Sequence, residues 1–191
     1  METSNHHRMK AVFLDRDGTI NVERHYVYRK EDFILMPGVL EALKILTHNR
    51  IPIFIATNQA GIARGFFTEA DYHALTLHML ELFAKNSIII QETAFCPHHP
   101  DASIPEYRQR CGCRKPGTKM LETLLSKWAI HPQEAVLVGD KNSDVDAGRS
   151  LGMKTYLVLT GHGRDHCASS RADHVVNDLK AAVEHMCGVQ A

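Results

Sequence analysis

Asp15 and Asp17 flank a single arginine directly after the short apolar run 11–14, and Gly18 follows them. A turn at this glycine can bend the chain so that both carboxylates border one pocket. Two adjacent carboxylates repel each other unless a cation lies between them, and hard oxygen ligands of this kind suit Mg²⁺. An aspartate can also attack phosphorus, while a second carboxylate donates and accepts the proton. The pair therefore indicates either phosphoryl-transfer chemistry or a simple turn cap.

Other residues suited to binding phosphate or metal follow later predicted strands. Thr57 offers a hydroxyl group after an apolar, β-branched run, and Lys115 offers a fixed positive charge for a phosphoryl group in transfer. Asp140 follows Gly139 and could supply a further oxygen to Mg²⁺. We expect Asp144, one helical turn later, to support the site or cap a helix rather than bind the metal directly.

A long segment rich in cysteine, histidine, proline and arginine occupies residues 96–115. It has no clear hydrophobic period, so we interpret it as one ordered loop. A loop of this length inside a compact domain needs something to hold it, and a bound metal could supply the ordering free energy.

Three cysteines and one histidine in this loop form a possible metal-binding set. Cys96 and His98 are followed by Cys111 and Cys113. Three thiolates and one imidazole make a closed tetrahedral set, which is typical of structural zinc. The spacing within each pair is tighter than in common zinc fingers, and His99 is an alternative to His98 as the fourth ligand.

Apolar runs and amphipathic stretches alternate along the chain. The predicted strands are 11–14, 51–56, 88–95, 135–138, 155–159 and 174–176, and the predicted helices are 39–49, 68–85, 117–128, 143–151 and 178–187. This alternation predicts an α/β protein with a parallel sheet covered on both faces, that is, a three-layer α/β/α Rossmann-like fold with a mainly parallel central sheet. Ligands of such sheets bind at the carboxyl ends of the strands, where the polar residues above are found.

Length and composition fit one compact domain. The chain has 191 residues, 44% of them apolar, and equal numbers of basic and acidic residues give a formal net charge of zero. We expect a flexible leader at 1–10 and a single domain at 11–191. The charge balance disfavours a broad surface for nucleic acid or an anionic membrane, and no apolar run approaches the ~20 residues that span a bilayer. We expect a cytoplasmic protein that acts as a monomer.

The ordered set of motifs resembles the haloacid dehalogenase superfamily. It consists of D-R-D-G-T at 15–19, T-N at 57–58, the lysine at 115 and G-D-x-x-x-D at 139–144. The resemblance implies that Asp15 is the nucleophile and Asp17 the general acid and base. It further implies that Thr57 and Lys115 hold phosphate, and that Asp140 binds Mg²⁺ together with Asp15 and the backbone carbonyl of Asp17.

The cysteine-rich loop between the second motif and the lysine resembles a zinc-bearing branch of this superfamily. That branch includes histidinol-phosphate phosphatases and heptose-bisphosphate phosphatases, and the runs 57–65, 96–100, 113–116 and 139–141 look closer to the latter. The resemblance implies removal of the 7-phosphate from D-glycero-D-manno-heptose 1,7-bisphosphate, in the synthesis of heptose nucleotides and lipopolysaccharide precursors. Mg²⁺ would be the catalytic ion and Zn²⁺ the structural one.

A bisphosphate substrate has a second phosphate group, and the protein needs side chains that bind it. Arg114 is our first candidate because a guanidinium binds phosphate through two hydrogen bonds. Arg64 and Lys141 are further candidates. The resemblance places substrate contacts at two more stretches, namely Glu23, Arg24, His25 and Tyr26, and Asn58, Gln59 and Ala60. The interval 19–37 has room for a loop or hairpin only, so we expect no large cap domain over the site.

Three other functions remain as alternatives. A histidinol-phosphate phosphatase would bind a cationic imidazole and would favour acidic groups at the rim, where Arg114 instead offers positive charge. A phospho-acceptor signalling domain would have no use for Asp17 as acid and base. A zinc-dependent nucleic-acid module is disfavoured by the zero net charge.

Overall fold

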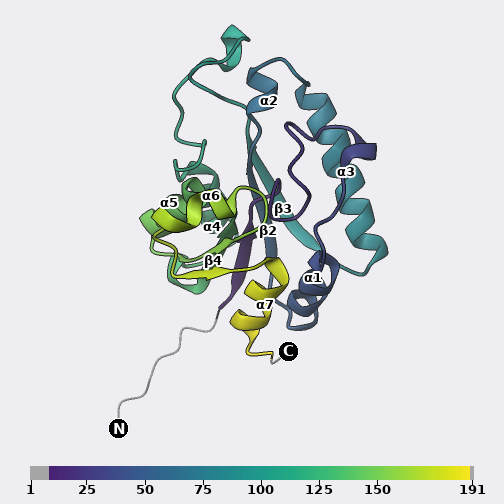
Figure 1. Ribbon diagram of the computed structural model, residues 1–191, viewed down its shortest axis with the longest axis vertical. Coiled ribbons are helices and arrows are strands. Elements are labelled where there is room, and N and C mark those ends of the chain that lie inside the picture. The colour runs from purple at the N-terminus through teal and green to yellow at the C-terminus, as the bar shows by residue number, and fades with distance from the viewer. Residues whose placement is uncertain (1–8, 190–191) are drawn as a thin grey trace.

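The computed structural model describes residues 9–189 (Figure 1). Residues 1–8, and with them most of the predicted leader, lie outside the described residues. The two leader residues that are described pack on the domain. Met9 contacts the hydrophobic core, and the backbone N–H of Lys10 donates a hydrogen bond of 2.7 Å to the carbonyl of Glu134.

A six-stranded parallel sheet forms the centre of the molecule, in the order β3-β2-β1-β4-β5-β6. The strands are β1 Ala11–Leu14, β2 Ile53–Asn58, β3 Ile90–Cys96, β4 Ala135–Gly139, β5 Lys154–Val158 and β6 His174–Val176. From the central strand β1, the chain first adds β2 and β3 on one side. It then crosses to the other side of β1 and adds β4, β5 and β6 there. This reversal opens a crevice at the carboxyl ends of β1 and β4, where doubly wound folds place their ligands.

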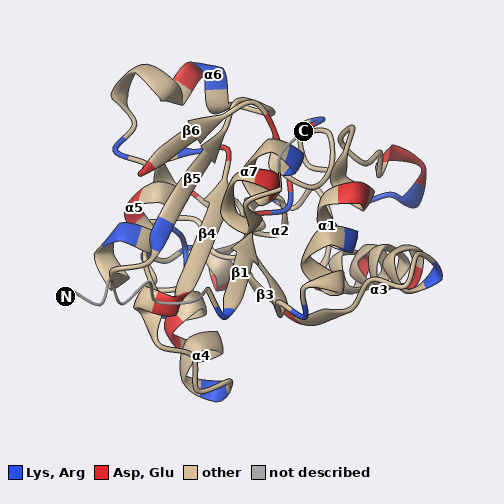
Figure 2. Cartoon of the chain, turned by 90° about the horizontal axis from the view of Figure 1, so that it is seen from below, with Lys and Arg blue, Asp and Glu red and all other residues tan. Residues whose placement is uncertain are grey.

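Helices cover both faces of this sheet, as predicted. They are α1 Val39–His48, α3 Glu69–Lys85 and α7 Leu179–Cys187 on one face, and α4 Lys119–Lys127 and α5 Asn142–Leu151 on the other. Alternation along β1 explains the two cores, because Val12 and Leu14 pack under the first layer while Ala11 and Phe13 pack under the second. Figure 2 shows the two helix layers flanking the strands, with acidic and basic residues mixed in both.

Local sequence signals explain where several elements begin. Thr68 caps α3, and its hydroxyl oxygen accepts a hydrogen bond from the backbone N–H of Asp71, whose carboxylate bonds Thr68 in return. The second strand begins two residues later than predicted, because Pro52 has no N–H and the register starts with Val12 opposite Ile53. The third strand also starts later, because the N–H of Ile88 bonds the carbonyl of Phe83 and closes α3.

The short elements lie mostly in the connections. They are α2 Ala60–Ala63, α6 Gly163–His166, and the 3-10 turns η1 Lys30–Asp32, η2 Pro105–Tyr107, η3 Pro132–Glu134 and η4 Cys167–Ser169. Between β1 and α1 there is only η1, with isolated bridges that Asn21 makes to Asp17 and Leu35. The expected absence of a large cap domain therefore holds for the described residues. Among these same residues, no helix combines the length and the apolar character that a membrane span requires.

Candidate active site and zinc cluster

A pocket of about 320 Å³ lies at the carboxyl ends of the central strands. Asp15 follows the end of β1 directly, and Thr57 is the second-last residue of β2. The lining residues are Asp15, Asp17, Glu23, His25, Tyr26, Thr57, Asn58, Gln59, Ala60, Arg64, His99, Arg114, Lys115, Lys141, Ser143, Asp144 and His162. The parallel sheet thus brings together motif residues as distant in the sequence as Asp15 and Asp144, which are 129 positions apart.

Lys115 contacts the carboxylate of Asp15 inside this pocket. Its Nζ atom donates hydrogen bonds to Oδ1 of Asp15 at 2.8 Å and to the carbonyl of Ala56 at 2.6 Å. Burial raises the pKa of Asp15, but the positive charges of Lys115 and Lys141 outweigh burial and hold that pKa below its usual value. Asp15 is therefore a charged carboxylate at neutral pH, which is the form a nucleophile needs.

Asp15, Asp140 and Asp144 form a buried group of acids, and one carboxylate oxygen from each lies within 4.8 Å of the other two. Oδ2 of Asp140 accepts a hydrogen bond of 2.8 Å from the backbone N–H of His162, whereas its buried Oδ1 has no hydrogen-bond partner. Burial, reinforced by the negative charge of Asp15, raises the pKa of Asp140 to about 7. The Nζ atom of Lys141 lies 3.8 Å from this Oδ1, beyond hydrogen-bond distance. A buried carboxylate oxygen without a hydrogen-bond partner, facing a second carboxylate, fits a divalent cation bound by oxygen ligands.

Asp144 supports this group rather than completing it. Its Oδ1 pairs with Nζ of Lys115 at 2.6 Å, and its Oδ2 accepts a hydrogen bond of 3.0 Å from the backbone N–H of Lys141. Both oxygens are therefore engaged within the protein, and the second contact caps α5. This geometry agrees with the supporting role expected from the sequence.

The carboxylate of Asp17 lies apart from this group of three acids. The guanidinium of Arg16 holds it, with Nη2 at 2.8 Å from Oδ2 and 2.9 Å from Oδ1, and the side-chain amides of Asn21 and Gln59 each donate to it at 3.0 Å. The expectation that one cation lies between the two neighbouring carboxylates is therefore not met, because a neighbouring arginine neutralises Asp17. That its backbone carbonyl binds Mg²⁺ stays a prediction. Asp17 still lines the pocket, as a general acid must.

The structure places most of the proposed substrate-binding residues around the pocket. Arg24 is the exception, because its side chain is exposed and does not line the cavity. His25 and Tyr26 adopt positive φ angles of 48° and 69°, and this turn brings both to the pocket wall. Sequence reasoning missed His162, which lies in the connection between β5 and α6 and lines the pocket.

The rim of the pocket carries positive charge. Burial lowers the pKa of His99, and the nearby cations of Arg114 and Arg64 lower it further. The buried Nη1 atom of Arg114 has no hydrogen-bond partner. A guanidinium nitrogen buried without an acceptor, with a second arginine nearby, is suited to an anionic group of a ligand.

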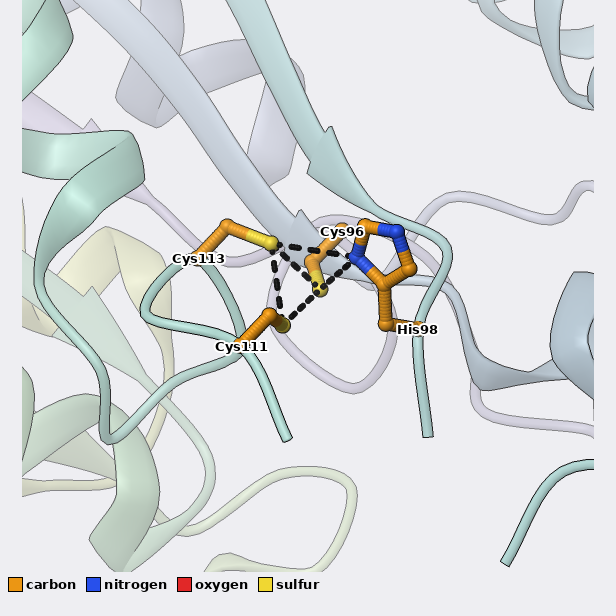
Figure 3. A group of neighbouring side chains, drawn as sticks. All are labelled: Cys96, His98, Cys111 and Cys113. Atoms are coloured by element: carbon orange, nitrogen blue, oxygen red, sulfur yellow. Dashed lines mark hydrogen bonds between the residues drawn. The ribbon is translucent and has the colours of Figure 1, made fainter. Parts of the chain in front are cut away.

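The four predicted zinc ligands lie together (Figure 3). The Sγ atom of Cys113 is 3.0 Å from that of Cys96 and 3.1 Å from that of Cys111, and Nδ1 of His98 is 3.4 Å from the sulfur of Cys113. Burial is the main cause that raises the pKa of the Cys96 thiol. Three sulfurs and one imidazole nitrogen converging on one point can hold zinc, with no position left open for a substrate.

His98, rather than His99, belongs to this cluster. Nδ1 of His99 accepts a hydrogen bond of 3.1 Å from the backbone N–H of Asp101, and its ring faces the pocket. Cys113 lies two residues before Lys115, so the cluster anchors the segment that carries the lysine into the site.

Comparison with known proteins identifies relatives over nearly the whole chain. Residues 112–182 match the HAD-hydrolase-like family model. A D-glycero-α-D-manno-heptose-1,7-bisphosphate 7-phosphatase of Photorhabdus laumondii is 41% identical over 82% of this chain and 86% of its own length. A D-glycero-β-D-manno-heptose-1,7-bisphosphate 7-phosphatase of Escherichia coli K12 is 40% identical over 88% of this chain and 89% of its own length.

A solved structure agrees with these sequence relatives. The D,D-heptose 1,7-bisphosphate phosphatase of B. bronchiseptica, complexed with magnesium and phosphate, superposes with a TM-score of 0.85 and 31% identity, and the match covers 95% of this chain and all of that one. The chain therefore belongs to the heptose-1,7-bisphosphate 7-phosphatase family of the HAD-like hydrolases.

Proposed function

We propose that this protein is a Mg²⁺-dependent phosphatase that removes the 7-phosphate from D-glycero-D-manno-heptose 1,7-bisphosphate, in the synthesis of heptose nucleotides and lipopolysaccharide precursors. The observation that carries the proposal is the contact of Asp15 with Lys115 at 2.8 Å, at the bottom of a pocket with a basic rim. A charged carboxylate beside a fixed ammonium group can attack a phosphate ester whose negative charge that ammonium offsets.

In the first half of the reaction, a carboxylate oxygen of Asp15 forms a bond to phosphorus. The bond between phosphorus and the sugar oxygen breaks, and that oxygen takes a proton from Asp17. The hydroxyl group of Thr57 and the ammonium group of Lys115 bind the phosphoryl oxygens during this transfer. The products of this half are the dephosphorylated sugar and an aspartyl phosphate at Asp15.

In the second half, the carboxylate of Asp17 takes a proton from water. The water oxygen attacks phosphorus, the acyl phosphate bond to Asp15 breaks, and inorganic phosphate leaves. Arg16, Asn21 and Gln59 hold Asp17 in place for both proton transfers. Asp17 ends each cycle protonated and ready to act as the acid again.

Asp15 and Asp140 would hold Mg²⁺, with the backbone carbonyl of Asp17 as a further ligand. When bound, the ion would offset the repulsion between these carboxylates and the phosphate. Asp144 keeps Lys115 in place next to the ion-binding acids.

The basic rim supports a substrate with a second phosphate group. Arg64, Arg114 and His99 form the rim, and Arg114 has a buried nitrogen without an acceptor. Curated relatives carry names with either the α or the β anomer of the sugar, so the anomeric centre is the part of the substrate on which family members differ.

The test is phosphate release from heptose 1,7-bisphosphate and from histidinol phosphate, each with and without Mg²⁺. We expect Mg²⁺-dependent release that favours the bisphosphate by at least tenfold in kcat/KM, and loss of release in Asp15→Asn with the thermal midpoint retained. Preference for histidinol phosphate would assign the chain to that activity instead. A stable phosphoprotein without turnover would indicate the signalling function.

We further propose that the enzyme acts as a monomer in the cytoplasm. A reducing compartment supports the second part, because it keeps clustered thiols available for zinc. Sedimentation velocity at micromolar concentration tests the first part, and a dimer there would contradict it.

A further inference from the structure

The side chain of Gln59 contacts two residues of the proposed catalytic site, Asp17 and Thr57. Gln59 lines the pocket but is only 3% exposed, so it is largely withdrawn from solvent. The amide nitrogen Nε2 donates one hydrogen bond of 3.0 Å to Oδ2 of Asp17 and another of 2.8 Å to Oγ1 of Thr57. One side chain therefore contacts both the acid and base and the hydroxyl group that binds phosphate.

The neighbouring Arg16 fixes the orientation of this amide. Nη2 of Arg16 lies 3.3 Å from Oε1 of Gln59, and a guanidinium has donors but no acceptor. The amide oxygen must therefore face Arg16, and the amide nitrogen must face Asp17 and Thr57. The reverse orientation would set two donors against each other and place the amide oxygen against a carboxylate.

This orientation also determines what the hydroxyl group of Thr57 can do. Because Oγ1 accepts a hydrogen bond from Gln59, the single hydroxyl proton is available to donate into the pocket, where a phosphoryl oxygen would accept it. Arg16 is 1% exposed and also bonds the carbonyl of Val27 at 3.0 Å, so the group that orients the amide is itself held by the fold.

We propose that Gln59 is a positioning residue rather than a substrate ligand: its amide aligns Asp17 for proton transfer and turns the hydroxyl proton of Thr57 toward the phosphoryl group. The inference rests on the proposed roles of Asp17 and Thr57. It predicts a defect that depends on the leaving group, because an alkoxide leaving group needs a proton from Asp17 whereas p-nitrophenolate leaves without one.

The experiment measures kcat and KM of Gln59→Glu and Gln59→Met on a sugar phosphate and on p-nitrophenyl phosphate. Glutamate keeps the size and the acceptor that faces Arg16 but lacks the donor, and methionine removes the donor without adding charge. Since general acid catalysis contributes about 10²–10⁴-fold, we expect kcat/KM, which reports only the first half of the reaction, to fall about 10–100 times more on the sugar phosphate than on the aryl phosphate. KM should rise for both substrates as Thr57 loses its partner.

The ratio of the two activities is measured on one preparation, so a partly unfolded variant does not change it. Gln133→Glu, an exposed residue of η3 at the opposite end of the sheet, makes the same charge change and should leave both activities within twofold. Equal losses on the two substrates, or none, would overturn the positioning role. If the parent protein, without any substitution, hydrolyses neither substrate, the proposed function is wrong, and the inference about Gln59 is wrong with it.

Discussion

The side-chain amide of Asn58 pairs with the backbone of Lys115 through two hydrogen bonds of 3.0 Å each. Oδ1 accepts from the lysine N–H, and Nδ2 donates to the lysine carbonyl. The two residues are 57 positions apart and come from the end of β2 and from the loop that follows the zinc cluster. Asn58 thus fixes the main chain from which Lys115 reaches Asp15.

Replacing Asn58 should therefore impair catalysis through the lysine. Asn58→Ala leaves two backbone groups without their partner, and we expect a loss of about 1–3 kcal/mol in the free energy of unfolding. A displacement of Lys115 by about 1 Å can reduce kcat about 100-fold. Steady-state kinetics and thermal unfolding measure the two effects. Asn58→Asp, which can still accept from the N–H, should lie between the alanine variant and the parent, and an unchanged kcat in Asn58→Ala would mean that other contacts place the lysine.

Asp140 should be needed for activity with Mg²⁺, and its charge should destabilise the fold when Mg²⁺ is absent. Asp140→Asn removes a metal-binding charge, and we expect activity in Mg²⁺ to fall at least about 100-fold, because outer partners of metal ligands alone typically cost about 10–100-fold. In buffer free of Mg²⁺ the same variant should unfold at a higher temperature than the parent at pH 8. The reason is that the pKa of Asp140 is raised from its usual value near 4 to about 7, so stability is lost as the pH rises between these values and the full penalty is present above pH 7.

The stability advantage of Asp140→Asn should shrink as the pH falls below about 7, because Asp140 then carries a proton in the parent. Mg²⁺ should raise the thermal midpoint of the parent and not that of the variant, since an ion that binds only the folded state stabilises it. Asp146→Asn on α5, the helix that follows Asp140, is the matched control, because Asp146 pairs with Arg171 at the surface. Equal Mg²⁺-induced shifts in the parent and in Asp140→Asn would remove Asp140 from the metal site.

Removing one zinc ligand should empty the cluster. For Cys111→Ser we expect purified protein without zinc and a thermal midpoint lower by about 6–12 °C, which corresponds to about 3 kcal/mol in a domain of this size. Metal analysis and thermal unfolding measure both. Cys167→Ser is the matched control, because Cys167 is exposed and outside the cluster. Equal zinc content in the two variants would discard the ligand assignment.

The sequence predicted the strand ends well because buried parallel strands have a strong hydrophobic signal. The run 11–14 is a strand with the predicted bounds, and the fully buried residues of β1 explain why. The helix predicted at 68–85 is α3, and its start is a local feature, because Thr68 and Asp71 cap it within one turn. Short elements such as α6 Gly163–His166 have no apolar period and were missed.

The contacts of the side chains inside the site were less predictable. Arg16 stands between the two aspartates in the sequence, but that it neutralises Asp17 depends on the turn at Gly18, whose φ angle is 87°. Gln59 and Asn58 were expected to face substrate, whereas their amides bond Asp17 and Lys115, which lie 42 and 57 positions away. Such pairings depend on tertiary structure and leave no periodic signal in the sequence.

Asp173 should make the stability of the domain depend on acid pH. Its Oδ2 accepts hydrogen bonds of 2.8 Å from the backbone N–H and from the hydroxyl group of Thr155. Burial raises the pKa of Asp173, but these two bonds and the nearby Arg149 outweigh burial and lower it. A depressed folded-state pKa contributes stability that is present above the unfolded pKa near 4 and is lost as the pH falls through the folded value.

Asp173→Asn should therefore be less stable than the parent at pH 7, by about 1 kcal/mol once the 37% exposure of the carboxylate is taken into account. That difference corresponds to about 2–4 °C in the thermal midpoint. Measured from pH 7 to pH 3, the gap should close below about pH 4, because the parent then loses the same charge. Glu81→Gln on the exposed face of α3 should show no such gap. A gap of constant size at every pH would mean that the variant loses packing or hydrogen-bond geometry rather than the charge of Asp173.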